Sequence, residues 1–173
     1  MTCRLLTAHD VERLLEGQDL VGLMAEALAS LSAGAVVQPV RTSVLVGPER
    51  AVLGVMPAHL PARGALGAKL VTVFNQNAQR GLPTHHATVL LFDDQTGALA
   101  AIIDGSHITE VRTAAVSMVA VRHLAGAPVR RAAVFGCGVQ ARSHVRALAA
   151  EAPSLEEIRV FSAYGDPAAF VQE

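Results

Sequence analysis

The sequence predicts an α/β protein in which an N-terminal α+β part is followed by a strand–helix–strand unit. Two observations carry this prediction. Residues 37–104 consist mainly of β-type runs separated by turn signals. From Ala132 onward the chain reads as an apolar strand, a glycine-containing turn, a helix and a second strand, at the spacing of a parallel βαβ unit.

Two helices are expected before the β-rich region. Thr7 followed by Asp10 is typical of a helix N-terminus, and apolar residues at helical spacing follow until Gly17 breaks the pattern. Asp19 is expected to cap a longer helix that ends at Gly34, a residue type common just after helix C-termini.

The β-rich region predicts a mixed or antiparallel sheet. Its turn signals include Gly47-Pro48, residues 61–64 and the segment from Asp93 to Gly97, which is typical of a hairpin connection. The expected strands are 41–46, 51–56, 65–74, 88–92 and 99–103.

A long helix from about Ser106 to Leu124 is expected to link two domains. Ser106 is the predicted cap, and Gly126 with Pro128 stops the helix. The predicted domains are residues 1–128 and 129–173, and the second is too short to form a stable core alone.

Composition points to a small molecule as the partner. The formal net charge is −1 and no basic run is present, which disfavours nucleic acid or an anionic membrane. No apolar stretch approaches the roughly 18 residues of a membrane span, and the first residues lack the apolar core of a signal peptide, so a cytoplasmic location is expected. Cys3 and Cys137 are too few for a disulfide framework, and no spacing indicates a metal site.

The turn from Gly136 to Ala141 has the GxGxxA pattern of a dinucleotide-binding fold. Gly136 permits a tight turn, Gly138 lets the backbone approach a pyrophosphate, and Ala141 lets the helix pack closely on the strand. A pyrophosphate would lie on the free N–H groups of the helix N-terminus. Small residues also mark ordinary strand-to-helix turns, so the pattern alone leaves both interpretations open.

The ribose end of this candidate site lacks its usual acid. A carboxylate commonly follows the second strand and binds the ribose 2′-OH, but Ser162 stands at that position. Loss of the carboxylate removes a repulsion against a 2′-phosphate, and no Arg or Lys follows immediately to bind one. The sequence therefore selects neither NAD nor NADP.

Three cations are candidates for chemistry. Lys69 lies in an apolar strand, where it is either solvent-facing or an amine whose pKa is lowered by burial and which acts as acid and base. Arg112 could pair with the nearby Glu110, and Arg41 could be an ordinary surface residue. Alternatively, the two guanidinium groups converge on a substrate carboxylate.

Four segments together resemble the ornithine cyclodeaminase and mu-crystallin family. Over nearly the whole chain they follow the order of that family: Gly67-Ala68-Lys69, Arg80 to His85, Asp104 to Ala115, and Gly136 to Ala141. The resemblance implies a first domain that binds substrate and forms a homodimer, followed by a Rossmann domain that binds NAD or NADP.

The adjacent His85 and His86 are expected on opposite faces of a strand, so they are not expected to form a joint metal site.

The resemblance also implies roles for individual residues. Lys69 would be the catalytic acid/base and, with Arg41, Met56 and Arg112, would bind the substrate. The implied cofactor-binding residues are Thr84, Arg112, Thr113, Gly136, Gly138, Val139, Gln140, Ala141 and Ser162.

The implied activity is NAD(P)-dependent hydride chemistry on a small α-amino or α-imino acid. It would be either the conversion of ornithine to proline or the redox chemistry of alanine or a cyclic ketimine. Family members extend further, and the residues beyond include a second catalytic Asp, so this chain is expected to carry an incomplete active site. Whether it is itself an enzyme is left open, and the alternative is a non-catalytic dimeric module that binds a small ligand.

Overall fold

A computed structural model describes residues 2–48, 50–163 and 165–172. The chain forms two compact units, one from residues 1–18 and 27–109 and the other from residues 19–26 and 110–173. The functional domain boundary at residue 128 stays a prediction. Within the described ranges, no helix is both long and apolar enough to cross a bilayer.

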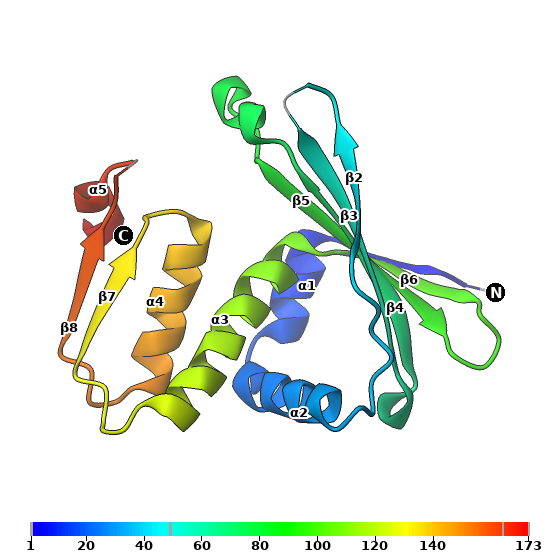
Figure 1. Cartoon of the computed structure of the whole chain (residues 1–173), viewed down its shortest axis with the longest axis horizontal. Coiled ribbons are helices and arrows are strands. Elements are labelled where there is room, and N and C mark those ends of the chain that lie inside the picture. The colour runs from blue at the N-terminus through cyan, green and yellow to red at the C-terminus, as the bar shows by residue number, and fades with distance from the viewer. Residues whose placement is uncertain (1, 49, 164, 173) are drawn as a thin grey trace. The chain divides into compact units, whose positions relative to one another are not determined.

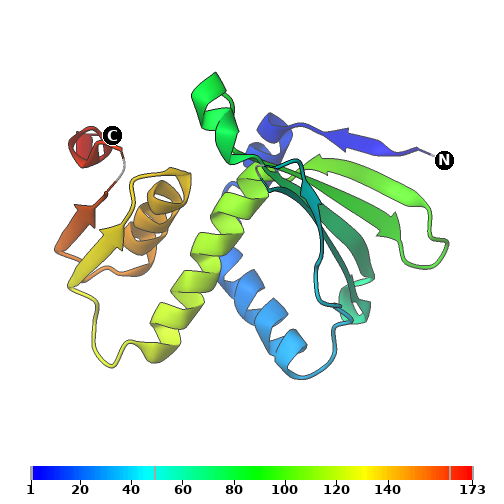
Figure 2. The ribbon, with the colours of Figure 1, turned by 45° about the horizontal axis from the view of Figure 1, so that its top comes forward.

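The first unit is built on a six-stranded mixed sheet (Figure 1). The sequence predicted a mixed or antiparallel sheet of five strands. The observed strand order is β1-β6-β5-β4-β3-β2; β1 pairs parallel with β6 and every other neighbour is antiparallel. Figure 2 shows β1 at the edge of the sheet beside β6. The strands are β1 (Arg4–Leu6), β2 (Thr42–Val46), β3 (Ala51–Leu60), β4 (Ala65–Val73), β5 (His85–Asp93) and β6 (Leu99–Asp104).

The structure corrects three strand predictions. The strand β1 was not predicted, β3 continues past residue 56 to Leu60, and β5 begins at His85 instead of residue 88. The extensions arise from pairing with β4, whose two ends lie opposite Leu60 and His85. Short 3-10 helices, η1 (Pro61–Arg63) and η2 (Asn75–Arg80), flank β4.

The two expected N-terminal helices are confirmed. Helix α1 (Ala8–Leu15) begins with a capping box in which Thr7 accepts from the backbone N–H of Asp10 and the Asp10 carboxylate accepts from the backbone N–H of Thr7. Helix α2 (Leu20–Ser32) follows Asp19, whose Oδ1 accepts from the backbone N–H of Gly22 at 2.8 Å.

Helix α3 (Ser106–Leu124) has the predicted extent, but Ser106 is its first residue and not its cap. Gly105 precedes the helix, and its carbonyl accepts from the backbone N–H of Thr109. A Cβ at Gly105 would lie 3.0 Å from the Cβ of Ala87. Packing against β5 therefore favours glycine just before the helix, where local sequence preference favours serine.

The core of the first unit lies where α1 covers β6. Val11 from α1 packs with Ala101 and Ile103 from β6, and all three are buried. Partly buried apolar side chains surround them: Leu6, Leu15, Val89 and Ile108.

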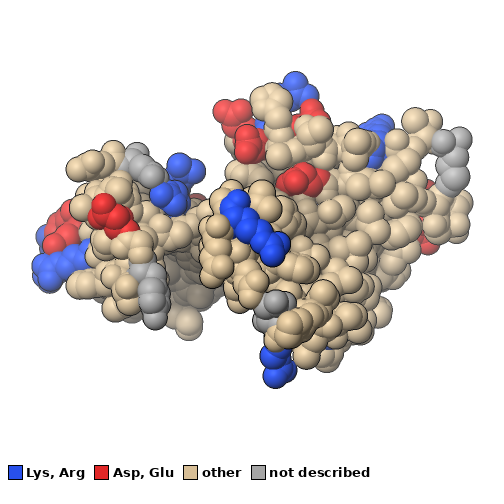
Figure 3. Space-filling model, turned by 90° about the horizontal axis from the view of Figure 1, so that it is seen from above, with Lys and Arg blue, Asp and Glu red and all other residues tan. Residues whose placement is uncertain are grey.

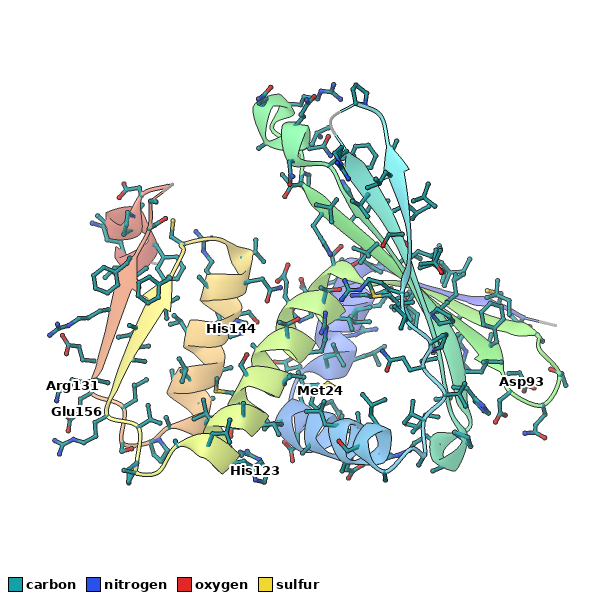
Figure 4. All side chains as sticks on the ribbon, in the orientation of Figure 1. Met24, Asp93, His123, Arg131, His144 and Glu156 are labelled. Atoms are coloured by element: carbon teal, nitrogen blue, oxygen red, sulfur yellow. The ribbon has the colours of Figure 1, made fainter. Side chains whose placement is uncertain are left out.

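The second unit contains the predicted strand–helix–strand element. Strands β7 (Arg131–Phe135) and β8 (Glu157–Phe161) pair in parallel, α4 (Val139–Glu151) connects them, and α5 (Pro167–Gln172) follows, a helix that was not predicted. The core of the second unit contains Val21, Ala115, Met118, Val119 and Leu148. Met24 of α2 packs against this core (Figure 4).

Candidate functional site

Lys69 lies in the middle of β4, in one cross-strand row of the larger sheet. The register pairs it with Met56 on β3 and with Val89 on β5, and Val89 in turn pairs with Ile103 on β6. Residues directly opposite each other across strands share a face of the sheet. Lys69 therefore has Met56 on one side and the apolar core of the first unit on the other.

Arg41 continues this row at the edge of the sheet. Thr42, the first residue of β2, pairs with Val55, so the preceding residue of the antiparallel strand lies in register with Met56. Arg41 is exposed. The structure thus brings the predicted substrate residues Arg41, Met56 and Lys69 into consecutive positions of one cross-strand row that ends at the β2 edge of the sheet.

The amine of Lys69 is half-buried and contacts a buried hydroxyl. Its Nζ lies 3.5 Å from Oγ1 of Thr109, which is 8% exposed. The Thr109 hydroxyl donates its single proton to the carbonyl of Gly105 at 2.7 Å, so Lys69 is the donor in their contact. Lys69 is also the only lysine in the chain.

The glycine turn in the second unit has the geometry expected for a pyrophosphate site. Gly136 has φ +105°, a conformation that favours glycine, and its N–H donates to the carbonyl of Phe161 at 2.7 Å. Gly138 is extended and stands at the N-terminus of α4 without a side-chain cap. A Cβ built on either glycine meets no atom within 4 Å apart from those of its chain neighbours.

This open space and the N–H groups of the first turn of α4 fit a phosphate group. The first N–H groups of a helix have no acceptor within the helix and favour negative charge. Val139 and Gln140 are exposed at this end of α4, whereas Ala141 is half-buried. These residues could therefore hold the diphosphate of a dinucleotide by their backbone.

Ser162 follows β8 directly and lies beside the glycine turn. The Sγ of Cys137 donates to its Oγ at 3.4 Å. A Cβ on Gly165, where φ is +88°, would lie 2.7 Å from the same Sγ. Ser162 and Gly165 therefore lie closely against the turn, and a role of Ser162 at the ribose of a cofactor stays a prediction.

The remaining predicted residues are distributed over both units. Thr84 lies in the first unit just before β5, half-buried, and its carbonyl accepts from the backbone N–H of Phe74 at 2.8 Å. Arg112 and Thr113 lie on α3 in the part assigned to the second unit; Arg112 is exposed and Thr113 is half-buried. The convergence of Arg41 with Arg112 stays a prediction, as do the cofactor roles of Thr84 and Thr113.

A polar contact between α3 and α4 was not found by sequence reasoning. His144 Nδ1 lies 2.7 Å from the carbonyl of Gln140, and Nε2 lies 2.9 Å from Oγ of Ser117 (Figure 4). A carbonyl only accepts hydrogen bonds, so Nδ1 carries a proton. The contact ties the start of α4 to α3. Helical spacing, with His144 four residues after Gln140, was the only local signal for it.

Sequence reasoning also missed Arg142. Its Nη1 lies 3.5 Å from the carbonyl of Cys137, and its Cζ lies 5.3 Å from the centroid of the buried Phe170 ring. The guanidinium is thus held between the glycine turn and α5. Only the position of Arg142, directly after Ala141, could have indicated it.

A separate pocket of about 360 Å³ lies in the first unit near η2. None of the predicted site residues lines it. Its walls are Ala51, Phe74, Asn75, Gln76, Asn77 and Arg80. Figure 3 shows acidic and basic residues interspersed on the face in view, with no continuous basic patch there.

The parallel βαβ element and its glycine turn define the class of the chain as an α/β protein with a Rossmann-type strand–helix–strand element. The ornithine cyclodeaminase/mu-crystallin family model matches residues 1–169, and the chain belongs to this family. The predicted family and fold class are thereby confirmed.

Among curated relatives, the chain is similar to ketimine reductase mu-crystallin of Rattus norvegicus, with 41% identity over 161 residues that cover 91% of this chain and 51% of the relative. It is also similar to Delta(1)-pyrroline-2-carboxylate reductase of Bacillus cereus, with 34% identity, covering 83% of this chain and 44% of the relative. The chain thus spans about half the length of the curated relatives that it matches.

Solved structures share the fold. Delta(1)-pyrroline-2-carboxylate reductase of Thermococcus litoralis, in complex with NADH and L-proline, superposes with a TM-score of 0.89 at 31% identity, covering 98% of this chain and 53% of that one. An archaeal alanine dehydrogenase dimer with bound NAD superposes with a TM-score of 0.90 at 28% identity, covering 99% of this chain and 52% of that one.

Proposed function

We propose that this chain belongs to an enzyme that transfers hydride between NAD(P) and a small α-amino or α-imino acid. The observation that carries the proposal is the row formed by Arg41, Met56 and Lys69, on a chain whose second unit holds an open glycine turn. A guanidinium, an apolar side chain and an amine are the groups needed to bind a carboxylate, pack a small carbon skeleton and exchange a proton at nitrogen.

Each residue has one task in the proposed reaction. Arg41 and Arg112 hold the α-carboxylate, and Met56 packs against the carbon skeleton. The nicotinamide supplies or accepts hydride when it is bound. In the reductive direction Lys69 donates a proton from Nζ to the substrate nitrogen, and in the oxidative direction it accepts one.

Thr109 supports this role of Lys69. Its hydroxyl accepts from Nζ and is itself fixed by the carbonyl of Gly105, which restricts where the amine lies. Orientation of a reacting group before the chemical step lowers the activation barrier.

Relatives support the class of substrate. One is named a ketimine reductase and another a Delta(1)-pyrroline-2-carboxylate reductase. A third, solved at 30% identity, is described as a lysine cyclodeaminase that recognises L-lysine, L-ornithine and L-2,4-diaminobutyric acid. For the whole protein we propose one of two reactions, redox chemistry of alanine or a cyclic ketimine, or cyclodeamination of ornithine to proline. Turnover assays with each substrate distinguish them.

We further propose a homodimer, because a related alanine dehydrogenase is described as a dimer. The edge strand β2 presents apolar side chains to solvent, with Val44 51% and Leu45 57% exposed. Exposed apolar residues on an edge strand are typical of a surface that pairs with another chain. The cytoplasmic location stays a prediction.

The first experiment uses Lys69 as a probe. Reductive methylation with isotope-labelled formaldehyde places labelled methyl groups on this single lysine and on the N-terminal amine. Adding L-proline or pyrrole-2-carboxylate should shift the Lys69 signal and leave the N-terminal signal unchanged. Arg41→Gln should weaken this response, whereas Arg146→Gln on α4 should not.

The second experiment measures turnover with Delta(1)-pyrroline-2-carboxylate and reduced nicotinamide cofactor. Oxidation of the cofactor that disappears in Lys69→Met and persists in Arg146→Gln supports the enzyme. Ligand binding without turnover, unaffected by Lys69→Met, would instead support a non-catalytic ligand-binding module. A folded chain with no Lys69 shift and no turnover would contradict the proposal.

A further inference from the structure

The residue at the end of β8 bears on which cofactor is bound. Where NAD is bound, a carboxylate at this position commonly accepts from the ribose 2′-OH. Ser162 stands there instead, with its Oγ accepting from Sγ of Cys137 in the glycine turn. A hydroxyl is uncharged and includes a donor, so it tolerates a 2′-phosphate that a carboxylate would repel.

The nearest acid in the segment after β8 has another task. Between Ser162 and Gln172 the sequence contains one acid, Asp166. Its Oδ1 accepts from the backbone N–H of Ala168 at 2.8 Å, at the start of α5. Asp166 therefore caps the short helix and lies beyond the position where a ribose-binding carboxylate would stand.

Arg142 supplies a positive charge next to this position. It lies in the first turn of α4, with Nη1 3.5 Å from the carbonyl of Cys137. Because the side chain of the same Cys137 contacts Ser162, Arg142 and Ser162 are joined through one residue of the glycine turn. Stacking over Phe170, at 5.3 Å, holds the guanidinium toward the segment that follows β8.

We propose that the cofactor of this site is NADP(H), and that Arg142 and Ser162 bind the 2′-phosphate of its adenosine ribose. This inference rests on the proposed function and adds to it the choice of cofactor. A guanidinium binds phosphate through two parallel N–H groups, and one that is already held by packing loses less conformational freedom on binding.

A purely structural role for Arg142 would use the same contacts. The residue would then only join the glycine turn to α5, and its loss would weaken every nucleotide equally. A comparison of two ligands that differ only in the 2′-phosphate separates these roles.

The test is calorimetric titration of the 173-residue chain with 2′,5′-ADP and with 5′-ADP. We expect 2′,5′-ADP to bind about tenfold or more tightly, as is typical of one charge-assisted contact. Arg142→Gln should lower this ratio to within about threefold of unity and leave the affinity for 5′-ADP unchanged. The matched control is Arg146→Gln, one turn further along α4, which should keep the full ratio.

Ser162→Asp is a second, independent variant. The added carboxylate should weaken 2′,5′-ADP and preserve or strengthen 5′-ADP, so the preference falls or reverses. This variant decides the question if Arg142→Gln fails to fold, as thermal unfolding would reveal. A preference unchanged in Ser162→Asp would overturn the proposal.

The failure of this inference is distinguishable from that of the proposed function. Binding of 5′-ADP as tightly as 2′,5′-ADP, or equal weakening of both by Arg142→Gln, overturns the choice of NADP(H) and leaves a nucleotide site in place. A folded chain that binds neither ligand overturns both proposals.

Discussion

Lys69 on β4 and Thr109 in the first turn of α3 are joined by a hydrogen bond of 3.5 Å between Nζ and Oγ1. Thr109 is buried, and its proton is already donated to the carbonyl of Gly105. The hydroxyl therefore presents an acceptor to the amine. This contact restrains the amine of the single lysine of the chain, and it gives the buried threonine hydroxyl a second hydrogen-bond partner.

The pair should be energetically coupled. In a double-mutant cycle with Lys69→Met and Thr109→Val, we expect a coupling energy of about 0.5–1.5 kcal/mol, typical of one such hydrogen bond. Urea unfolding followed by circular dichroism measures it. Thr72→Val on the other face of β4 is the control and should add to Lys69→Met within a few tenths of a kcal/mol. If the effects of Thr109→Val and Lys69→Met on the free energy of unfolding were also additive, this result would contradict the contact between the two side chains.

Gly67 should tolerate no side chain. A Cβ at this position would lie 2.7 Å from the carbonyl oxygen of Leu90 and 3.1 Å from a methyl group of Leu91. Because the first clash is with backbone, Gly67→Ala should destabilise the chain by about 1–3 kcal/mol. Gly126→Ala is the matched control, since a Cβ there meets nothing within 4 Å. Similar unfolding midpoints for the two variants would show that β4 and β5 lie further apart.

Asp93 should make the β5–β6 hairpin sensitive to acid (Figure 4). Thr96 donates to its carboxylate from Oγ1 and from the backbone N–H, each at 2.7 Å, and the pKa of Asp93 is held below its usual 3.8 chiefly by these bonds. A carboxylate whose pKa is lower in the folded than in the unfolded chain stabilises the fold at pH values above its unfolded pKa. This stabilisation is lost as the pH falls through the folded pKa.

Asp93→Asn should therefore lower the melting temperature at neutral pH, and the difference from the parent chain should shrink as pH falls below 3.8. Thermal unfolding across a pH series measures this difference. Thr96→Val removes the largest cause of the lowered pKa, so Asp93→Asn in that background should have a smaller, less pH-dependent effect. A difference that is constant with pH would exclude the carboxylate as the source.

Local patterns predicted those parts of the fold that depend on neighbouring residues. The helix start at Thr7 and Asp10 and the cap at Asp19 were predicted because the bonds that form them span only three residues. β1 was missed because three residues show no alternation, and its pairing with β6 joins distant parts of the chain. The prediction that Ser106 caps α3 was wrong. The residue before the helix is Gly105, and the crowding by Ala87 that favours glycine there is a tertiary effect.

The candidate site shows the same limit. The sequence singled out Lys69 and Arg41 as residue types, but only the register places both in one row with Met56. The contact with Thr109 also depends on how the first turn of α3, which belongs to the first unit, lies against β4. Arg142 was not predicted, because its contact with Phe170 follows from the packing of α5 and its contact with the Cys137 carbonyl follows from the path of the glycine turn.

The glycine turn provides the last prediction, because its two glycines are needed for different reasons. Gly136 has φ +105°, which an L-residue rarely adopts, so Gly136→Ala should strain the free chain and lower its melting temperature. Gly138 is extended at φ −88° with open space around it, so Gly138→Ala should cost about 1 kcal/mol or less, as a poorer helix cap. The methyl group added in Gly138→Ala fills the space where a pyrophosphate would approach.

We therefore expect calorimetry to show at least about tenfold weaker binding of 5′-ADP in Gly138→Ala, with a nearly unchanged fold by circular dichroism. Unchanged nucleotide binding by a folded Gly138→Ala chain would show that the ligand does not lie on this turn.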